Sequence, residues 1–422
     1  MTLPSRLDGL PPYPLQDVPE IRARLRAEGR DVLDLGAGDS GLPIPEIAVE
    51  ALARAAGDDA YQGYAFQRGL PAFREEIAAF MGRRFSAAVD PWDEVLPVIG
   101  SKEAIALAAF ALLDPGDTVL IPDPGYAPYF GGAYFAGAHI ERVPLRAEEG
   151  WLVPPGRIRD APGRLRLVYL NYPNNPTAAV AGADYLAEVV AACAERGATL
   201  LYDNAYSEIT FDGYRAPGLL EIEGGREVGL EFHSLSKTYN MTGWRLGWVA
   251  GDAELIGALK RVKTFFDTGS FLAMQAAGAA VLADAEAFIA RNVAWLRERR
   301  DAAVSALSGA GLEVESPRAT LYLWLPVPGG DSHGWCRSLL EDEAVVLLPG
   351  AALGSGGEGY ARASLTLAPE RYADLTARIG RIAEAEPAVQ AEPAVQAEPA
   401  VQAERAARVG RAEQVGGSGR TA

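Results

Sequence analysis

The polar segment around which this chain is organised reads Ser234-Leu235-Ser236-Lys237-Thr238-Tyr239-Asn240-Met241-Thr242-Gly243-Trp244-Arg245. Apolar runs at 228–232 and 246–251 flank it and are typical of buried strands. A lysine held between buried strands is often desolvated, which lowers its pKa and makes its amine a usable nucleophile. Ser234, Ser236 and Arg245 add hydroxyl donors and a forked cation that suit a phosphate. The segment therefore predicts an amine nucleophile, Lys237, beside an anion site; a solvated loop with an incidental lysine is the alternative.

Composition excludes several classes of function. The chain has 422 residues, 49% of them hydrophobic and 23% charged, which is enough for a large core and two domains. A formal net charge of -17 argues against nucleic acid as a partner. Cys193, Cys336 and three scattered histidines match no metal or disulfide spacing, so we expect no metal and a reducing, cytoplasmic location. We also expect no membrane partner, since no signal segment and no long uncharged apolar run is found.

Most of the chain alternates predicted strands and helices. Between residues 94 and 250 the predicted strands lie at 94–99, 118–121, 139–143, 166–170 and 198–202. They are short and continuously apolar, which favours an α/β fold with a mostly parallel central sheet covered by helices on both faces. Helices at 265–282, 285–307, 333–341 and 369–383, with strands at 321–325, 344–348 and 360–365, predict a smaller α+β domain.

The predicted domain boundaries follow from these patterns. Residues 1–44 form an N-terminal arm, with an extended proline-rich piece at 10–14, and part of the small domain. Residues 45–282 form the large domain, and residues 283–383 form the small C-terminal domain. The motif Glu-Pro-Ala-Val-Gln-Ala occurs three times in tandem from Glu386. Its prolines exclude a continuous helix, so residues 384–422 are expected to form a low-complexity, disordered tail without a catalytic role.

Several polar residues follow predicted strands. Ligands of open α/β sheets bind at the carboxyl ends of the strands. We therefore expect one pocket to contain Ser101, Tyr126, Asn175, Asp203 and Lys237. A nucleophilic amine beside a phosphate site is the combination that pyridoxal 5'-phosphate requires.

A glycine-rich loop at 36–41 offers a different interpretation. Its spacing matches a dinucleotide-binding loop, but Pro43 and Pro45 prevent a helix from starting where a pyrophosphate would need its N-terminus. A sharp turn or a close backbone approach to a ligand is favoured. The aromatic loop at 61–69 is open to two readings, packing or ligand contact.

Residues 10–382 resemble the fold-type I pyridoxal-phosphate enzymes, specifically the class I/II aminotransferases. The resemblance is closest to the diaminopimelate, alanine and aspartate aminotransferase branch. It rests on Gly100-Ser101-Lys102-Glu103, Asn174-Asn175-Pro176-Thr177, Asp203-Asn204-Ala205-Tyr206 and Ser234-Leu235-Ser236-Lys237. It implies transfer of an amino group between an L-amino acid and a 2-oxo acid in two half-reactions, with pyridoxal phosphate as cofactor.

The resemblance also implies roles for residues around the cofactor ring. Lys237 would form the Schiff base and then act as the general base. Asp203 would pair with the pyridine nitrogen, and Tyr206 and Asn175 would bind the ring hydroxyl. Tyr126 would stack on the ring.

Further roles concern the phosphate, the substrate and a second subunit. Ser101, Lys102, Ser234, Ser236 and Arg245 would bind the phosphate, with Tyr64 reaching it across a dimer interface. The resemblance thus implies a homodimer with shared active sites. Arg362 would bind the substrate α-carboxylate, with Gly38 and Asn175 as further substrate contacts.

One position departs from the family pattern. The family usually has glycine after Asn-Pro-Thr, whereas Ala178 and Ala179 follow here. Alanine does not easily adopt a positive φ, so we expect an altered turn. No second arginine for a side-chain carboxylate stands out, and the substrate stays open. A lyase or decarboxylase on the same fold is an alternative, as is a non-catalytic cofactor-binding regulator, although no DNA-binding module is recognisable.

Overall fold

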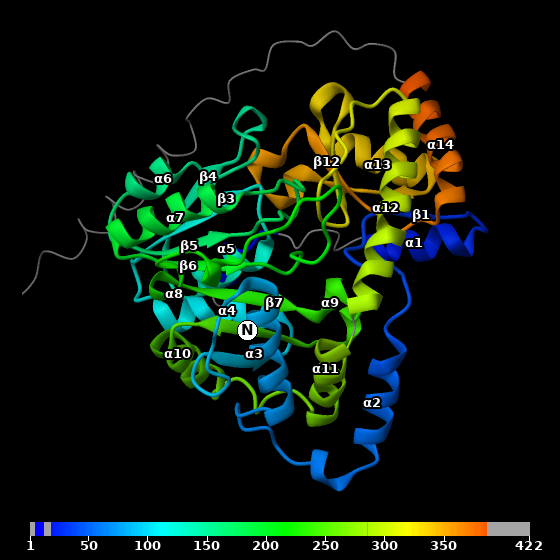
Figure 1. Ribbon diagram of the computed structural model, residues 1–422. Helices are drawn as coiled ribbons and strands as arrows, with labels where there is room; N and C mark the ends of the chain where they lie inside the picture. The colour runs from blue at the N-terminus through cyan, green and yellow to red at the C-terminus, as the bar shows by residue number, and fades with distance from the viewer. Residues whose placement is uncertain (1–4, 12–17, 285, 386–422) are drawn as a thin grey trace, which may run out of the picture. The chain divides into compact units, whose positions relative to one another are not determined.

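The computed structural model describes residues 5–11, 18–284 and 286–385 (Figure 1). Part of the predicted proline-rich arm, at 12–14, lies outside these residues, and so does the predicted tail from Glu386 onward with its three tandem repeats.

A seven-stranded sheet forms the centre of the larger part. Its strand order is β2-β8-β7-β6-β5-β3-β4, and only β8 runs antiparallel to its neighbours. The strands are β2 Val95–Val98, β3 Thr118–Asp123, β4 His139–Pro144, β5 Leu165–Leu170, β6 Thr199–Asp203, β7 Gly229–Ser234 and β8 Gly247–Gly251. The mostly parallel α/β sheet predicted from the sequence is confirmed. β8 lies beside β7, to which residues 235–246 join it, and runs antiparallel to it.

Both faces of this sheet are buried, which explains its continuously apolar strands. Neighbouring residues such as Leu200 and Leu201 enter different cores on opposite faces. One core includes residues of α2 (Glu46–Ala56), α3 (Pro71–Phe85), α6 (Pro155–Arg159), α7 (Ala183–Arg196) and α11 (Leu272–Asp284). The other includes residues of α4 (Ser101–Leu112), α5 (Ala127–Phe135) and α10 (Ala253–Lys263). A one-turn helix, α8 (Gly225–Val228), precedes β7.

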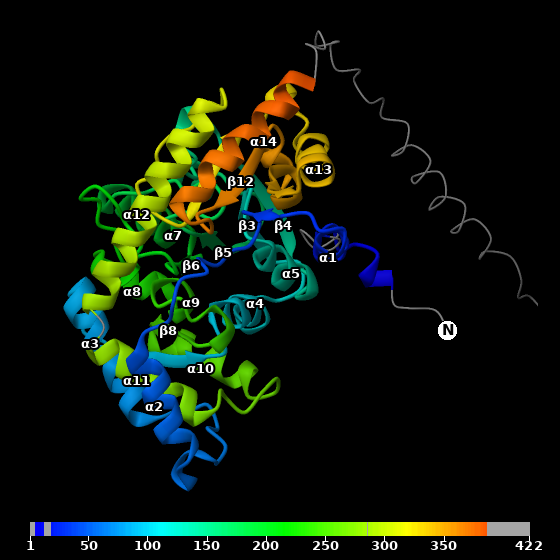
Figure 2. The same cartoon turned by 90° about the vertical axis from the view of Figure 1, so that its right-hand side faces the viewer.

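A second set of elements surrounds its own core. An antiparallel sheet of order β11-β12-β9 comprises β9 Tyr322–Pro326, β11 Leu348–Pro349 and β12 Tyr360–Ser364. The short strands β1 (Leu33–Asp34) and β10 (Val345–Val346) pair in parallel beside it. The helices are α1 Val18–Ala27, α12 Glu286–Gly309, α13 Ser332–Glu343 and α14 Tyr372–Ala385. Figure 2 shows α12 and α14 side by side. The domain boundaries given above stay a prediction.

Three segments differ from the predicted secondary structure. The helix predicted for 265–282 begins only at Leu272, because residues 265–271 form a loop in which Gly269 has a φ of 92° and Phe265 is 87% exposed. The predicted strand 344–348 is divided between β10 and β11, which belong to different sheets. The helix α10 was not predicted.

No single described helix is long and apolar enough to cross a bilayer, although the bent pair α11 and α12 passes that test by length and composition.

Candidate active site

A cavity of about 490 Å³ lies where β6 and β7 of the large sheet end and β12 of the small sheet approaches them. Twelve of the thirteen predicted site residues line it. They are Gly38, Ser101, Lys102, Tyr126, Asn175, Asp203, Tyr206, Ser234, Ser236, Lys237, Arg245 and Arg362. They are spread over more than three hundred positions of the sequence, so only the fold brings them together. The predicted convergence on one pocket is found; the individual roles stay predictions.

Lys237 lies on the single helical turn α9 (Leu235–Thr238), directly after β7. The hydroxyl of Ser234 accepts the backbone N–H of Ser236 at 3.2 Å and so caps this turn. The half-buried Lys237 ammonium donates to the carbonyl of Gly38. A Cβ on Gly38 would lie 3.1 Å from the Tyr322 hydroxyl, so this close approach favours glycine. The glycine predicted to contact a substrate therefore lies against the predicted nucleophile.

Asp203 ends β6 and is fully buried. Its Oδ2 accepts the Tyr129 hydroxyl at 2.8 Å, and the Asn171 side chain donates to its carbonyl at 2.6 Å. Its Oδ1 is buried and has no hydrogen-bond partner among the described residues. Burial raises the pKa of Asp203 to about 6, against the opposing effect of the Tyr129 hydrogen bond. A buried carboxylate oxygen without a partner, beside a cavity, can accept a proton donor from a ligand.

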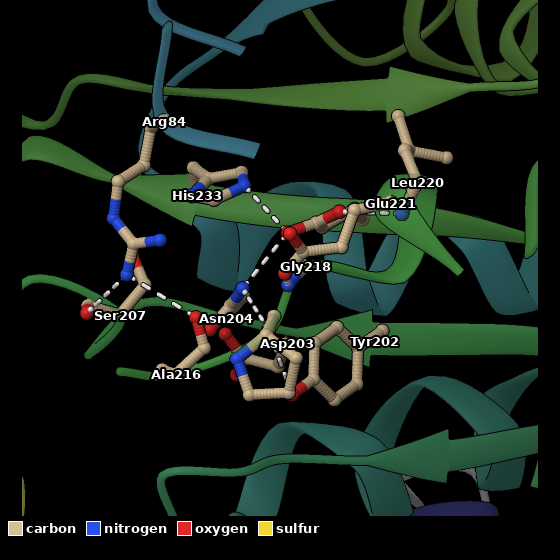
Figure 3. Close-up of polar contacts among 12 residues, drawn as sticks. Arg84, Tyr202, Asp203, Asn204, Ser207, Ala216, Gly218, Leu220, Glu221 and His233 are labelled. Atoms are coloured by element: carbon tan, nitrogen blue, oxygen red, sulfur yellow. Dashed lines mark hydrogen bonds and ion pairs between the residues drawn. The ribbon is translucent and has the colours of Figure 1, made fainter. Parts of the chain in front are cut away.

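Behind Asp203 a buried polar network joins the strands β6 and β7 (Figure 3). The Asn204 amide donates to Glu231 Oε1 at 2.8 Å, and His233 Nε2 lies 3.0 Å from the same oxygen. Glu231 Oε2 accepts the Leu220 N–H at 3.1 Å. Burial alone would raise the pKa of Glu231, but His233 and Asn204 outweigh it and lower that pKa. The His233 ring stacks on Trp248 with centroids 4.8 Å apart. This network holds the segment that begins at Asp203.

Arg362 reaches the cavity from β12. Its guanidinium donates to Asn175 Oδ1 at 2.8 Å and to the Gly36 carbonyl at 2.9 Å. Its Nε is buried and lacks a hydrogen-bond partner within the described part of the chain. The guanidinium carbon lies 4.3 Å from the centre of the Tyr322 ring. The site thus holds a buried, oriented cation, as recognition of a carboxylate requires.

Tyr322 is a cavity residue that the sequence did not indicate. Its hydroxyl lies 3.1 Å from that of Tyr206. Burial and Tyr322 raise the pKa of Tyr206. Burial would also raise the pKa of Tyr322, but Arg362 and Lys237 reverse the effect and lower it. The sequence indicated only that Tyr322 lies in a predicted strand. In the structure this strand, β9, pairs with β12, and Trp324 rather than Tyr322 is opposite Arg362. Tyr129 and Asn171 were missed as well.

The N-terminus of α4 forms the opposite end of the cavity. Gly100 precedes it with a φ of 73°, and a Cβ there would lie 2.3 Å from the Arg245 guanidinium. Arg245 Nη1 donates to the Thr242 carbonyl at 2.9 Å. Helix N-termini and arginines both favour anions, so this end suits a phosphate.

The turn after Asn174 contains an alanine in the left-handed region. Ala178 adopts a φ of 58°, and its N–H donates to the Asn174 carbonyl at 3.0 Å. Asn174 Oδ1 accepts the Thr177 N–H at 3.0 Å and its hydroxyl at 2.8 Å. Alanine thus adopts a positive φ here, in a turn that these hydrogen bonds support; the altered turn expected relative to the family stays a prediction.

Tyr64 is the predicted site residue that lies outside the cavity. It is 71% exposed, and its ring centre lies 5.4 Å from that of Phe66. Within one chain it does not line the site.

Comparison with known proteins identifies the family. The model of the family "Aminotransferase class I and II" matches residues 30–379. The chain belongs to the class I and II aminotransferases. An LL-diaminopimelate aminotransferase of Desulforudis audaxviator is 44% identical over 377 residues, covering 89% of this chain and 96% of the relative. The predicted family and its reaction class, amino-group transfer by an enzyme, are confirmed.

Solved aminotransferase-like structures share the fold. Substrate-bound BacF from Bacillus subtilis is 32% identical with a TM-score of 0.85, over 90% of this chain and 98% of that one. A probable N-succinyldiaminopimelate aminotransferase from Thermus thermophilus is 34% identical with a TM-score of 0.80, over 86% and 98%. Aminotransferases of this family and fold use pyridoxal phosphate, which moves the amino group.

Proposed function

We propose that this aminotransferase binds pyridoxal 5'-phosphate in the cavity and transfers the amino group of LL-diaminopimelate, or a closely similar L-amino acid, to a 2-oxo acid such as 2-oxoglutarate. The observation that carries the proposal is the buried Oδ1 of Asp203, which has no hydrogen-bond partner within the described part of the chain. It lies beside the cavity that the Lys237 amine and the Arg362 guanidinium also line.

The residues present fit this cofactor. Asp203 Oδ1 can accept the pyridine N–H, for which it has no competing partner in the described chain. Tyr206 and Asn175 are available for the ring hydroxyl, and Tyr126 for stacking. The phosphate is assigned to the other end of the cavity, to the N-terminus of α4 and to a set of polar side chains. This set comprises Ser101, Lys102, Ser234, Ser236 and Arg245.

When bound, pyridoxal phosphate supplies an electron sink for charge that develops at the amino acid Cα. Lys237 would hold the cofactor and would act as the base that moves the proton at the substrate Cα. Arg362, oriented by Asn175 and Gly36, binds the α-carboxylate and so directs Cα toward Lys237. Asp203 keeps the pyridine nitrogen protonated.

Diaminopimelate is favoured as donor by the relatives. Those at 38–44% identity carry the name LL-diaminopimelate aminotransferase. The sequence alone left diaminopimelate, aspartate and alanine open. Arg362 and Arg245 are the arginines that line the cavity, and both are assigned above. We therefore expect the side-chain carboxylate of a donor to be bound by groups other than an arginine of this chain.

A homodimer with shared active sites is part of the proposal. Tyr64 lies outside its own cavity, and exposed aromatic residues accompany it in the loops at 61–69 and 265–271. A partner subunit covering this surface would bury them and bring Tyr64 to the phosphate of its own site. We also propose a cytoplasmic location, with which two free, buried cysteines agree.

The test is a half-reaction without acceptor. Each donor of a panel containing LL-diaminopimelate, aspartate and alanine is mixed with the purified, cofactor-loaded protein. LL-diaminopimelate should change the cofactor absorbance and release a stoichiometric oxo acid, and 2-oxoglutarate should reverse the change. Lys237→Ala should lose turnover by at least about a thousandfold, since both covalent attachment and proton transfer disappear. Lys260→Ala, on α10, is the matched control and should keep wild-type turnover. Absence of an absorbance change with every donor would refute the proposal.

A further inference from the structure

A fully buried lysine lies outside the cavity. Lys263, the last residue of α10, has a side chain that is 0% exposed. Its ammonium donates to Glu103 Oε1 at 2.5 Å and to Asp267 Oδ2 at 2.6 Å. A buried ammonium is costly unless it is paired, so the three side chains depend on one another. The mechanism above uses none of them.

The Glu103 side of this cluster leads to the phosphate end of the cavity. Glu103 is the third residue of α4, two positions after Ser101. Its Oε2 accepts the backbone N–H of Ile99 at 2.9 Å. One carboxylate therefore holds both the first turn of α4 and the segment that enters it through Gly100.

The Asp267 side leads to the loop of Tyr64. Asp267 Oδ1 accepts the N–H of Gly269 at 2.6 Å and the Gln67 amide at 3.1 Å, and the same amide donates to the Asp267 carbonyl at 2.6 Å. Gln67 is 3% exposed and adopts a φ of 63°. The two loops touch closely, because a Cβ on Gly269 would lie 2.8 Å from Cβ of Ala65.

We propose that Lys263 is a positioning residue. Through Glu103 and Asp267 it fixes the position of the N-terminus of α4, where the phosphate is proposed to bind, relative to the loops 61–69 and 265–271. The inference rests on the proposed cofactor site for its effect on the reaction. Lys263 is not among the residues that line the cavity, and its ammonium pairs with Glu103 and Asp267. It acts by fixing the backbone that presents Ser101 on one side and the aromatic loop on the other.

One cation pairs with both carboxylates, and this links α10, which carries Lys263, to α4 and to the loop 265–271. Without the ammonium, the half-buried carboxylates of Glu103 and Asp267 would repel each other, which would weaken the link between α4 and the loops. The expected consequence is a looser phosphate site, with the chemistry of Lys237 and Asp203 unchanged once the cofactor is bound.

The test uses Asp267→Asn and Lys263→Met in the full chain. Asparagine retains an oxygen for Gly269 and Gln67 but loses the carboxylate that pairs with Lys263, so this variant should fold. Arg300→Met is the matched control, since Arg300 is also a buried cation (6% exposed) that pairs with two carboxylates, Asp212 and Asp301, on α12 and beyond. Amide hydrogen exchange at residues 99–103 and 65–69 is measured in the cofactor-free proteins. The dissociation constant of pyridoxal phosphate is measured by equilibrium dialysis.

Both test variants should exchange about tenfold faster at 99–103 and 65–69 and bind pyridoxal phosphate about tenfold more weakly. Turnover at saturating cofactor should stay within about twofold of wild type. The control should lower the unfolding temperature without either local effect. Wild-type exchange and wild-type cofactor affinity in a folded Asp267→Asn protein would overturn the inference. If the wild-type chain binds no pyridoxal phosphate, the proposed function fails, and the exchange measurement alone decides the inference.

Discussion

Asp203 shows how one side chain can be prepared for a ligand. Its Oδ2 is satisfied by Tyr129 at 2.8 Å, whereas its Oδ1 is buried without a partner among the described residues. An unpaired buried carboxylate oxygen costs free energy. Burial accordingly raises the pKa of this group to about 6. The cost is recovered when a ligand donates a hydrogen bond to Oδ1.

This raised pKa predicts a pH-dependent stability of the cofactor-free protein. A carboxyl with a raised pKa contributes stability that is fully present below its unfolded value of 3.8 and is lost as the pH rises through about 6. Asp203→Asn lacks this titration. The unfolding temperature of the variant should therefore rise relative to that of wild type between about pH 4 and pH 7. Thermal unfolding of both proteins across this range checks it; a difference independent of pH would contradict it.

Ala178 stores strain that a smaller residue would relieve. Its φ of 58° is unfavourable for a residue with a Cβ. Ala178→Gly should stabilise the protein by about 0.5–1 kcal/mol, because the cost of the left-handed conformation exceeds the added flexibility of the unfolded chain. The control is Ala179→Gly, whose position does not have a positive φ and which should destabilise by a similar amount. Chemical denaturation measures both, and a loss of stability in Ala178→Gly would count against the prediction.

At the scale of elements, β6 and β7 depend on a buried pair behind the site. Glu231 and His233 have side chains that are 0% and 3% exposed, and Asn204 links them to β6 (Figure 3). The antiparallel neighbour β8 contributes Trp248, against which the His233 ring stacks. β6 and β7 thus share a polar network behind Asp203, and β8 adds an aromatic contact to it.

Removing the charge of Glu231 should destabilise these strands. Glu231→Gln leaves His233 and the Leu220 N–H without their charged partner, at a cost of about 3 kcal/mol. A carboxyl with a lowered pKa contributes stability that is present above its unfolded value of 4.5 and is lost as the pH falls through the folded one. The difference from wild type should therefore shrink below about pH 4. Denaturation at neutral and acidic pH measures it; an equal deficit at both would argue against this pairing.

For the whole molecule, the cavity exists only because two sheets meet. The large sheet supplies Asp203 and Lys237, and the small sheet supplies Arg362 and Tyr322. Tyr64 belongs to neither wall. Under the proposed dimer it completes the phosphate site of the partner subunit.

The proposed dimer predicts that loss of the Tyr64 hydroxyl weakens cofactor binding without dissociating the dimer. Tyr64→Phe keeps the exposed ring but removes the hydroxyl, so it should weaken cofactor affinity about tenfold while the dimer persists. Tyr61→Phe, in the same loop, is the control. Analytical sedimentation measures the mass of the oligomer, and equilibrium dialysis measures the affinity for pyridoxal phosphate. A monomeric wild-type protein, or unchanged affinity in Tyr64→Phe, would remove the basis for shared active sites.

The sequence predicted most of the site because ligand-binding residues of α/β sheets follow the strands directly. Asp203 and Lys237 could be placed in this way without any long-range information. The first seven residues of the helix predicted for 265–282 are wrong, because their apolar side chains are exposed in a loop and local composition does not report exposure.

What the sequence alone determined is therefore the family, the mostly parallel sheet and the edge of that sheet at which the chemistry is located, since these depend on local apolar runs and short motifs. Tertiary structure decided the rest: that Tyr322 meets Tyr206, that Arg362 pairs with Asn175, that Lys263 pairs with Glu103 and Asp267, and that Ala178 adopts a positive φ. Each of these depends on hydrogen bonds or close contacts with the rest of the fold, which residue type and spacing in one segment do not specify.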